Sequence, residues 1–529
     1  MVLADAAVRC AAGDLDALVA LLHERGTAFS ASPPYPSEGL GQPRCARVEP
    51  LDRDRPCRDL LLEVVGQVLI DPARTGLVVG TSSGHISGPW ERWHRAELAG
   101  ESKNEGGTWR QSPTVEVAEA LGIPRHTTVS VACASGTVAF ALADGWLRDH
   151  PELDHVIVAG VDALSLYIHA GFNGLGALTA STPRPFSAER DGLLLGEGAA
   201  ALRVSRTGEG PELLGVGLSG DAVHMTAPDR EGRGCARGLR AALADAQRSA
   251  SEVDLVSVHG TGTNFNDNME AHALAAVFPE GVPLFGVKHA IGHTLGAAGA
   301  IEAAVAWHAW TSGRVPPGPA NVALDLPLKP LPPVKPRRIL STNSAFGGAN
   351  ASVLFGAGPA PRRAPREAVQ TATTHVRIGA GKVDWAAFWP DPPERFKRMN
   401  RYVRLGWLAA YRLLLDMPQP EHMGIVLASE SNCRHVDLRY HTKLVRRGAA
   451  GAPRVDFIYT IPGAPVGEIS IHWGLRGPQL SLAAPGHEAD AEAERLIRWG
   501  RADRLMTLAI EAPDANTAGV ATAALWECG

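Results

Sequence analysis

Cys133 and two histidines, His259 and His293, are the residues whose types and settings best suit nucleophilic chemistry. Cys133 stands in VSVACASGTVAF, between a segment that predicts a strand and one that predicts a helix. A thiol at a helix N-terminus faces free backbone N–H groups and the positive end of the helix dipole, which favour the thiolate. The small neighbours Ala134 and Gly136 let a substrate carbonyl approach backbone amides that can stabilise an oxyanion. Taken alone, a cysteine among small residues is more often a buried filler, so the assignment depends on the other motifs.

His259 stands in VSVHGTGTNFND (256–267), where a predicted buried strand runs into a glycine-rich polar loop. Thr261 and Thr263 add hydroxyl groups to this loop. A single histidine at a strand end is usually a satisfied structural group. A polar, glycine-rich loop at this point indicates binding instead, because loops of this kind carry function more often than stability.

The segment GVKHAIGHTLGAAGAIE (286–302) supplies Lys288 and His293, followed by small residues that allow close packing of a helix. Glu302 lies further along that helix and is expected to pair with Lys288 as a buried support. His289, in the same segment, is interpreted as a surface or wall residue.

A further glycine-containing loop, TNSAFGGANASVLF (342–355), leads into a predicted strand. Its backbone could supply an amide to an oxyanion hole. A simple turn fits the glycines nearly as well in isolation.

The bulk composition is that of a soluble globular protein. The chain has 529 residues, with 45% hydrophobic and 20% charged side chains, and its formal net charge of −5 gives no support to nucleic acid or anionic membrane binding. There is no apolar run long enough for a membrane span, and the N-terminus does not read as a secretory signal. The seven cysteines are scattered, odd in number and without a CxxC pair, which favours free thiols in a reducing cytoplasm and no metal site.

The motifs lie within residues 1–357, where strand and helix patterns alternate along the sequence. We interpret these residues as one compact unit with halves at about 1–205 and 206–357. Apolar strands alternating with helices imply an α/β protein with sheets covered on both faces. The strands expected in the first half are 77–83, 127–132, 154–162 and 196–204, and those in the second half are 253–260 and 352–358.

Residues 358–374 are rich in Pro, Ala and Arg and read as a linker, followed by a second globular segment at 375–529. That segment resembles a degenerate repeat of the first half. MGIVLASES (423–431) matches TGLVVGTSS (75–83), and ADRLMTLAIEA (502–512) matches LDHVIVAGVDA (153–163). The repeat places Gly486, or a neighbour, where Cys133 stands. Chance similarity between α/β segments is the alternative.

Together these segments resemble the β-ketoacyl-acyl-carrier-protein synthases. The resemblance covers about residues 1–357, and its elements follow the family's order: ACASG around Cys133, GFNGLGALTASTPRPFSAERDGLLLGEGAA (171–200), HMTAP (224–228), HGTGTNFND (259–267), KHAIGHTLGAAG (288–299) and FGGANAS (346–352). Each motif is weak alone, but six in order are highly specific. The resemblance implies the thiolase fold, in which two related α/β halves stack in five layers (αβαβα), here followed by a C-terminal degenerate half.

The resemblance also implies a chemistry. Cys133 matches the cysteine that takes an acyl chain from carrier protein as a thioester, and His259 and His293 match the pair that promotes malonyl decarboxylation and stabilises the enolate. Lys288 matches a lysine that orders the site. The other implied roles are Glu302 as acidic partner, the amides of Cys133 and Phe346 as oxyanion hole, and Thr261 and Thr263 as contacts of the phosphopantetheine arm. The implied product is a β-ketoacyl-carrier protein of fatty acid or, by preference, polyketide or polyene biosynthesis.

The sequence departs from the family at two places. Ser344 occupies the position of a gating phenylalanine, if FGGAN is the anchor, and Val131 stands where the family often has threonine. No bound cofactor is expected, since the carrier protein brings the phosphopantetheine.

The segment 375–529 is similar to the cysteine-less, chain-length-factor-like partners of aryl polyene systems. Because the family forms dimers through its N-terminal halves, we expect either a homodimer or a pseudo-dimer within one chain.

Three alternatives were weighed. A thiolase would need a second reactive cysteine near FGGAN, and none is present there. A non-catalytic chain-length factor or scaffold describes 375–529 well, but the intact motifs of 1–357 oppose it for the whole chain. A cysteine hydrolase would need an oriented base and a water path, and nothing in the sequence indicates them.

Overall fold

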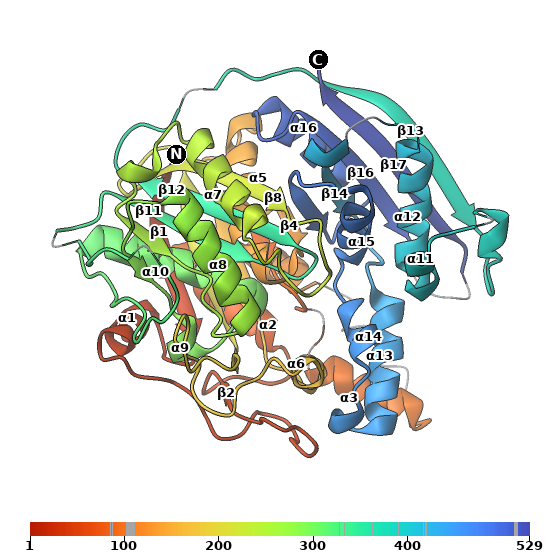
Figure 1. Cartoon of the computed structure of the whole chain (residues 1–529), viewed down its shortest axis with the longest axis horizontal. Coiled ribbons are helices and arrows are strands. Elements are labelled where there is room, and N and C mark those ends of the chain that lie inside the picture. Colours follow the sequence, from red (N-terminus) through yellow and green to blue (C-terminus); the bar gives the residue numbers. More distant parts are fainter. Residues whose placement is uncertain are drawn as a thin grey trace.

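A computed structural model of the chain describes residues 1–529 except 85, 87, 102–111, 327, 333, 362, 390, 416, 418, 419 and 513–516. Figure 1 shows the first unit beside the C-terminal segment, whose strands β13 and β17 form the opposite edge of the molecule.

The first half of the unit contains a sheet with mixed strand directions. Its order is β1 (Val2–Cys10), β7 (Gly198–Ser205), β5 (His155–Asp162), β3 (Thr75–Gly80) and β4 (Arg125–Val129). β3 is parallel to β4 and β5, whereas β7 is antiparallel to β5 and β1. The central strands are almost wholly buried and apolar, as expected for a sheet with helices on both faces.

The second half contributes a second sheet. Its order is β10 (Leu284–Phe285), β9 (Leu255–Ser257), β11 (Arg338–Ser344), β12 (Ala349–Gly356) and β8 (Glu212–Gly220). A single residue pair, Val2 with Glu212, joins it to β1 of the first sheet.

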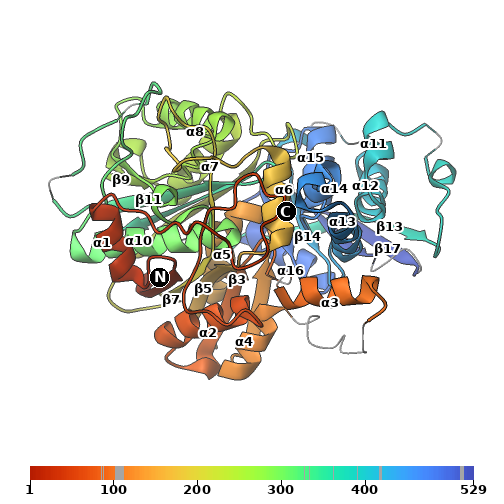
Figure 2. The same cartoon turned by 90° about the horizontal axis from the view of Figure 1, so that it is seen from below.

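Helices complete five layers around the two sheets. α5 (Ser135–Asp149) and α10 (Ala298–Ser312) lie between the sheets, and both are built from small residues because they are buried on nearly every side. α2 (Pro56–Val68) and α4 (Pro113–Leu121) cover the first sheet, while α7 (Arg233–Asp245) and α8 (Asn264–Val277) lie on the second-sheet side, with α7 packed on the sheet and α8 against α7. Figure 2 shows these outer helices on opposite sides of the unit. The predicted αβαβα layering is confirmed.

The C-terminal segment forms a third sheet that repeats the first one strand for strand. Its order is β15 (Gln479–Leu482), β14 (Gly424–Ala428), β16 (Arg504–Glu511), β17 (Gly519–Cys528) and β13 (Ala368–Ile378), corresponding to β4, β3, β5, β7 and β1. The strand directions also match, since β14 is parallel to β15 and β16 and β17 is antiparallel to β16 and β13. The predicted repeat of the first half is therefore confirmed.

One boundary of the repeat differs from the sequence interpretation. β13 begins at Ala368, inside the segment 358–374 that was expected to be a linker. The error arose because β13 is an edge strand whose first half is exposed on both faces, and only Val376 and Ile378 near its end are buried, so its sequence gave no clear apolar pattern. The remaining boundaries of the division into 1–357 and 375–529 stay a prediction.

The copied sheet covers the free edge of the first sheet. β15 pairs antiparallel with β4, with hydrogen bonds of 2.8 Å from the Ser130 N–H to the Ser481 carbonyl and 3.0 Å from the Ala483 N–H to the Thr128 carbonyl. On one face of the new sheet, α16 (His487–Arg498) packs beside α5, and Trp146 Nε1 donates to Glu492 at 3.0 Å. α12 (Arg401–Leu414) and α15 (Ala464–Trp473) cover the other face. The segment thus packs on the first unit, as we expected.

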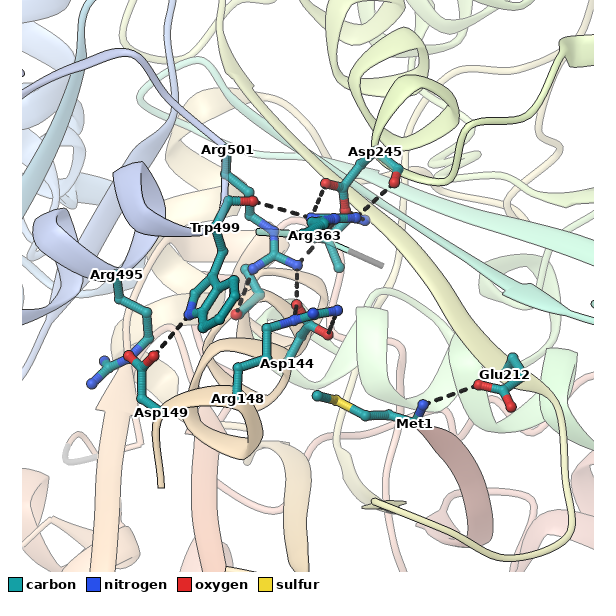
Figure 3. A network of polar contacts seen from close by, with 12 residues as sticks. Met1, Asp144, Arg148, Asp149, Glu212, Asp245, Arg363, Arg495, Trp499 and Arg501 are labelled. Carbon is teal, nitrogen blue, oxygen red and sulfur yellow. Dashed lines mark hydrogen bonds and ion pairs between the residues drawn. The ribbon is translucent and has the colours of Figure 1, made fainter. Parts of the chain in front are cut away.

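A buried polar network anchors the segment to both halves of the unit (Figure 3). Arg501, which follows α16, forms ion pairs with Asp144 of α5 and with Asp245 of α7, the second at 3.7 Å. Arg363 also pairs with Asp245, and Asp149 of α5 accepts a hydrogen bond of 2.9 Å from Trp499 Nε1. Because these charges are buried and mutually neutralised, loss of one would leave another unpaired.

The chain has further elements outside the three sheets and the helices named above. They are α1 (Leu15–His23), β2 (Cys45–Ala46), α3 (Gly88–Leu98), α6 (Leu166–Leu175), β6 (Leu195–Gly196), α9 (Lys288–Ile291), α11 (Glu394–Arg398), α13 (Arg434–Arg447) and α14 (Arg454–Ile458). Among the described residues, none of these or the other helices combines the length and apolarity needed to cross a bilayer.

Candidate active site

Cys133 lies in a tight 3₁₀ turn, Ala132–Ala134, between the end of β4 and the start of α5. Ala132 has a φ of 44°, a left-handed conformation that is uncommon outside glycine and marks a constrained turn. Ser135 stabilises the turn, because its Oγ accepts from the Val131 N–H at 2.9 Å and donates to the Ala132 carbonyl at 2.6 Å. The turn aims the thiol at the second half of the unit, where Cys133 Sγ lies 3.0 Å from His293 Nε2.

The second half brings two imidazoles to the thiol. His259 follows β9 and His293 follows α9, and their ring centroids are 5.3 Å apart with the planes at 85°. The two rings and the thiol lie close together although Cys133 and His293 are 160 residues apart in the chain.

A buried triad of Lys288, Glu302 and Asn343 stands behind His259. Lys288 forms an ion pair with Glu302, and Lys288 Nζ lies 3.3 Å from His259 Nδ1. Asn343 Nδ2 donates to His259 Nδ1 at 3.0 Å and to Glu302 at 2.8 Å. An ammonium and an amide NH₂ can only donate, so His259 Nδ1 must be the acceptor and the ring proton must reside on Nε2. The expected pairing of Lys288 with Glu302 is therefore present, and it orders the tautomer of His259.

Burial determines the protonation of the resting site. It lowers the pKa of His259 well below its ordinary value, helped by Lys288 and His293, and it lowers the pKa of His293 in the same way. Burial also raises the pKa of the Cys133 thiol to about 12, although the charge of Lys288 opposes this. The predicted stabilisation of the thiolate by the helix N-terminus is thus outweighed by desolvation of the buried thiol. The thiol is protonated at rest, beside a neutral imidazole that can accept its proton.

Two carboxylates that the sequence interpretation missed shape the loop after His259. Glu270 accepts from the His259 N–H at 2.6 Å and from the Gly260 N–H at 2.8 Å, and Asp267 accepts from the N–H groups of Thr261 and Gly262. Both belong to α8, one and two turns beyond the loop. The sequence did carry a signal. Two acidic residues that lie four to eleven positions beyond residues of a glycine-rich turn can accept hydrogen bonds from the backbone N–H groups of that turn.

A cavity of about 370 Å³ collects the predicted residues of the site. Its lining includes Cys133, His259, His293, Thr261, Thr263, Ser344 and Phe346. Lys288 and Glu302 are absent from the lining because they stand behind His259. His289 lies outside it and borders a separate cavity of about 210 Å³, in agreement with its interpretation as a wall residue.

The amides of Cys133 and Phe346 are available to a ligand. Within the described part of the chain, neither N–H donates a hydrogen bond to another backbone group. Phe346 begins a turn in which Gly347 and Gly348 have φ values of 86° and 83°, a conformation that consecutive L-residues rarely adopt. Ser344 Oγ donates to Asn350 at 2.6 Å, so this position presents a small side chain to the cavity where the family resemblance implied a phenylalanine.

The corresponding place in the C-terminal segment has no nucleophile. Gly486 lies four residues beyond the end of β15, as Cys133 lies four beyond the end of β4. A Cβ on Gly486 would lie 2.6 Å from Ala509 Cβ, so the backbone is too close to β16 to carry a side chain. Among the described residues, no group of three or more His, Cys, Asp or Glu is arranged to hold a metal ion.

Comparison with known proteins agrees with this geometry. Residues 61–209 match the model of the β-ketoacyl synthase N-terminal domain and residues 211–320 that of the β-ketoacyl synthase C-terminal domain. The 3-oxoacyl-[acyl-carrier-protein] synthase 2 of Rhizobium meliloti (strain 1021) is 30% identical over 323 residues, which is 54% of this chain and 74% of that protein. The chain spans between 56% and 61% of the length of the other curated relatives it matches, including the mitochondrial synthase of Arabidopsis thaliana.

Two solved structures align with this chain over different lengths. The ishigamide ketosynthase/chain length factor aligns with a TM-score of 0.59 and 27% identity over 68% of this chain and 99% of that chain. The PfaC keto synthase-chain length factor aligns with a TM-score of 0.78 over 100% of this chain and 78% of that one, at 16% identity, so it shows the shared fold alone. Both domain models match, the chain covers 74% of the Rhizobium meliloti synthase, and the motifs around Cys133 stand in the family's order. This chain therefore belongs to the β-ketoacyl synthase family.

Proposed function

We propose that the chain catalyses a decarboxylating condensation between an acyl thioester held on Cys133 and a malonyl thioester on carrier protein. The observation that carries the proposal is the convergence of Cys133 Sγ, 3.0 Å from His293 Nε2, with a second neutral imidazole, His259, in one cavity. A thiol and two neutral imidazoles supply a nucleophile, a proton acceptor and hydrogen-bond donors without further groups.

In the first half-reaction, the Cys133 thiol gives its proton to His293 and attacks the acyl thioester of the incoming carrier protein. The tetrahedral oxyanion is stabilised by the amides of Cys133 and Phe346. Its collapse expels the carrier thiolate, which takes the proton from the His293 imidazolium, and leaves the acyl group on Cys133. Proton transfer to an adjacent base is required because the resting thiol is protonated.

In the second half-reaction, His259 Nε2–H donates a hydrogen bond to the thioester oxygen of the malonyl group. The acylated Cys133 sulfur carries no proton, so His293 in its Nε2–H tautomer supplies a second donor. Loss of CO₂ places the electron pair in an enolate that these donors stabilise. The enolate carbon attacks the acyl carbonyl, forms the carbon–carbon bond and expels the Cys133 thiolate. The thiolate takes a proton from His293, which is reprotonated from water. The product is a β-ketoacyl thioester on carrier protein.

The carrier protein is the partner that this scheme requires, and its phosphopantetheine arm would pass Thr261 and Thr263 at the mouth of the cavity. We favour polyketide or polyene biosynthesis over fatty acid synthesis, because 68% of the chain aligns with solved structures of a ketosynthase with its chain length factor. The C-terminal segment would act as the non-catalytic partner, since Gly486 leaves no room for a nucleophile. It occupies the edge strand β4, so we propose a pseudo-dimer within one chain rather than a homodimer through that edge.

Intact-mass analysis with a panel of acyl and malonyl carrier proteins tests the proposal. The wild-type chain should gain one acyl mass and then release a β-ketoacyl product on addition of malonyl-carrier protein. Cys133→Ala should gain no mass, whereas Cys235→Ala, which removes an equally buried thiol from α7, should be acylated normally. A wild-type chain that never gains an acyl mass contradicts the proposal.

A further inference from the structure

Two loops form one side of the cavity mouth, and both are in contact with the C-terminal segment. We name them the Met225 loop, Asp221–Asp229, and the Phe346 loop, Ser344–Asn350. The cavity lining includes His224, Thr226, Ala227 and Pro228 of the first loop and Ser344, Ala345 and Phe346 of the second.

Hydrogen bonds hold the two loops together as a unit. The Gly347 N–H donates to the Met225 carbonyl at 2.8 Å, and the Asp221 N–H donates to the Gly348 carbonyl at 2.7 Å. Asn350 Nδ2 donates to Asp221 at 2.8 Å. Because Phe346 directly precedes Gly347, the first of these attachments, displacement of the Met225 loop would also displace the Phe346 amide.

The side chain of Met225 belongs to the hydrophobic core of the C-terminal segment. It is 3% exposed and packs in the cluster that contains Val466 and Ile469 of α15. α15 approaches closely at Gly467, where a Cβ would lie 2.7 Å from Met225 Sδ and 3.1 Å from Gly347 Cα. A residue of the catalytic unit is thus inserted in the neighbouring core while its backbone holds the Phe346 loop.

A second contact reaches the same loop from α14. The Phe457 ring packs edge-on against Phe172 of α6, with centroids 5.7 Å apart, and Phe172 stacks on Phe346 at 5.8 Å. A Cβ on Gly171 would lie 2.3 Å from the Phe457 ring, so the two helices are in close contact. Figure 1 shows α6 beside α14 at the base of the C-terminal segment.

From these contacts we infer that the C-terminal segment positions the Phe346 amide for catalysis, with Met225 and Phe457 as positioning residues that touch no substrate. The inference rests on the proposed function, because the Phe346 amide matters only if a tetrahedral oxyanion forms beside Cys133. A donor aimed at a developing oxyanion loses effect when it is displaced by even 1 Å. The non-catalytic segment therefore controls the rate of the reaction without contributing a group to the cavity.

Met225→Ala tests the inference against Met506→Ala, a matched change in the same core on strand β16. Met225→Ala should lower kcat for condensation about 10-fold or more, with little change in KM for the carrier protein, because the oxyanion donor is displaced and the binding surface is not. Met225→Leu should restore most of kcat, since the leucine side chain fills a similar volume. Met506→Ala should lose comparable stability and keep kcat.

Hydrogen exchange of residues 344–350 gives a readout that does not depend on activity. Exchange there should be faster in Met225→Ala than in wild type and unchanged in Met506→Ala. Phe457→Leu, which acts through Phe172, provides the same comparison if Met225→Ala does not fold.

The outcomes separate the inference from the proposed function. Equal kcat and equal exchange in the Met225 and Met506 variants would overturn the positioning role. A second outcome is that the wild-type chain makes no condensation product while exchange at 344–350 is still faster in Met225→Ala. That result would retain the structural coupling and reject the condensing activity.

Discussion

The first sheet and its copy in the C-terminal segment share one topology but differ at the strands beneath the nucleophile turn. In the first sheet, β3 and β5 carry Gly80 and Gly160 at paired positions, and the copy carries Ala428 and Ala509 there. A Cβ on Gly80 would lie 2.5 Å from the Gly136 nitrogen at the start of α5. The first unit thus has glycines on the strands and a side chain on the turn, whereas the copy has alanines on the strands and Gly486 on the turn.

In the first sheet, Gly80 leaves room for the start of α5, and Gly160 leaves room for Ala297 and Ala300 of the second half. In the copy, the methyl group of Ala509 occupies the space that a side chain on Gly486 would need. The copy also has no counterpart, among the described residues, to the second sheet that brings His259 and His293 to Cys133. What the copy retains is the edge strand and the helix that pack on the catalytic unit.

The largest difference between the two regions should appear when the nucleophile is removed. Cys133→Ala should lower acyl transfer by at least about 10³-fold, because no other group in the cavity can hold the acyl chain. Mass spectrometry of the chain incubated with acyl-carrier protein measures the transfer. Persistent acylation of Cys133→Ala, or an acyl group mapped to the C-terminal segment, would remove the distinction between catalytic and non-catalytic sheets.

Removal of the imidazole next to the thiol should have the next largest effect. His293→Ala should lower the condensation rate by about 10²–10⁴-fold, since the protonated thiol loses its proton acceptor. His289→Ala is the matched control, as this histidine borders a different cavity, and it should remain close to wild type in the same steady-state assay. Similar losses in both variants would indicate general damage to the segment rather than loss of a catalytic group.

The attachment of the copy to the catalytic unit can be weakened at Arg501. Arg501→Met should lower the free energy of unfolding by about 3 kcal/mol, because it leaves buried Asp144 with only Arg148 as a partner. Chemical denaturation measures this value. Arg92→Met, which breaks a surface ion pair with Asp54, should have a much smaller effect. Equal effects would show that the buried network does not anchor the segment.

The ion pair of Arg501 with Asp144 also predicts that the free energy of unfolding depends on pH. Burial raises the pKa of Asp144, but Arg501 and Arg148 lower it by more, so that it lies well below its ordinary value. A lowered folded-state pKa stabilises the protein above the unfolded value, which is about 3.9, and the stabilisation is lost as the pH falls below it. The stability difference between wild type and Arg501→Met should therefore be constant near neutral pH and shrink below about pH 4. A difference that stays unchanged at pH 3 contradicts this.

The smallest effect is expected at the turn of the copy. Gly486→Ala should destabilise the chain by about 1–3 kcal/mol, because the new methyl group meets Ala509. Ala509→Gly in the same chain should restore most of the loss, because it removes the methyl group that the new side chain meets. Thermal unfolding of the single and double variants is the measurement. Destabilisation without rescue would mean that a different neighbour excludes the side chain.

Much of the site could be predicted from the sequence, since Cys133 and His259 each stand where a predicted strand ends in a turn of small residues, and His293 precedes a predicted small-residue helix. The ion pair of Lys288 with Glu302 was expected because Glu302 lies further along that helix, and the structure contains it. Asn343 was missed because its motif was interpreted only for the backbone of the following turn. Its role depends on the distance from its amide to His259, which no spacing along the chain reveals.

The sequence by itself determined the alternation of strands and helices, the order of the motifs and the repeat that ends in Gly486. These properties are local, because periodicity, turn residues and missing side chains are visible along the chain. Only the tertiary structure decided that the resting Cys133 thiol is protonated, since desolvation depends on what surrounds the group from all directions. It also decided that Met225 lies in the core of the other segment while its backbone holds the Phe346 loop, because such a contact joins residues that are far apart in the chain.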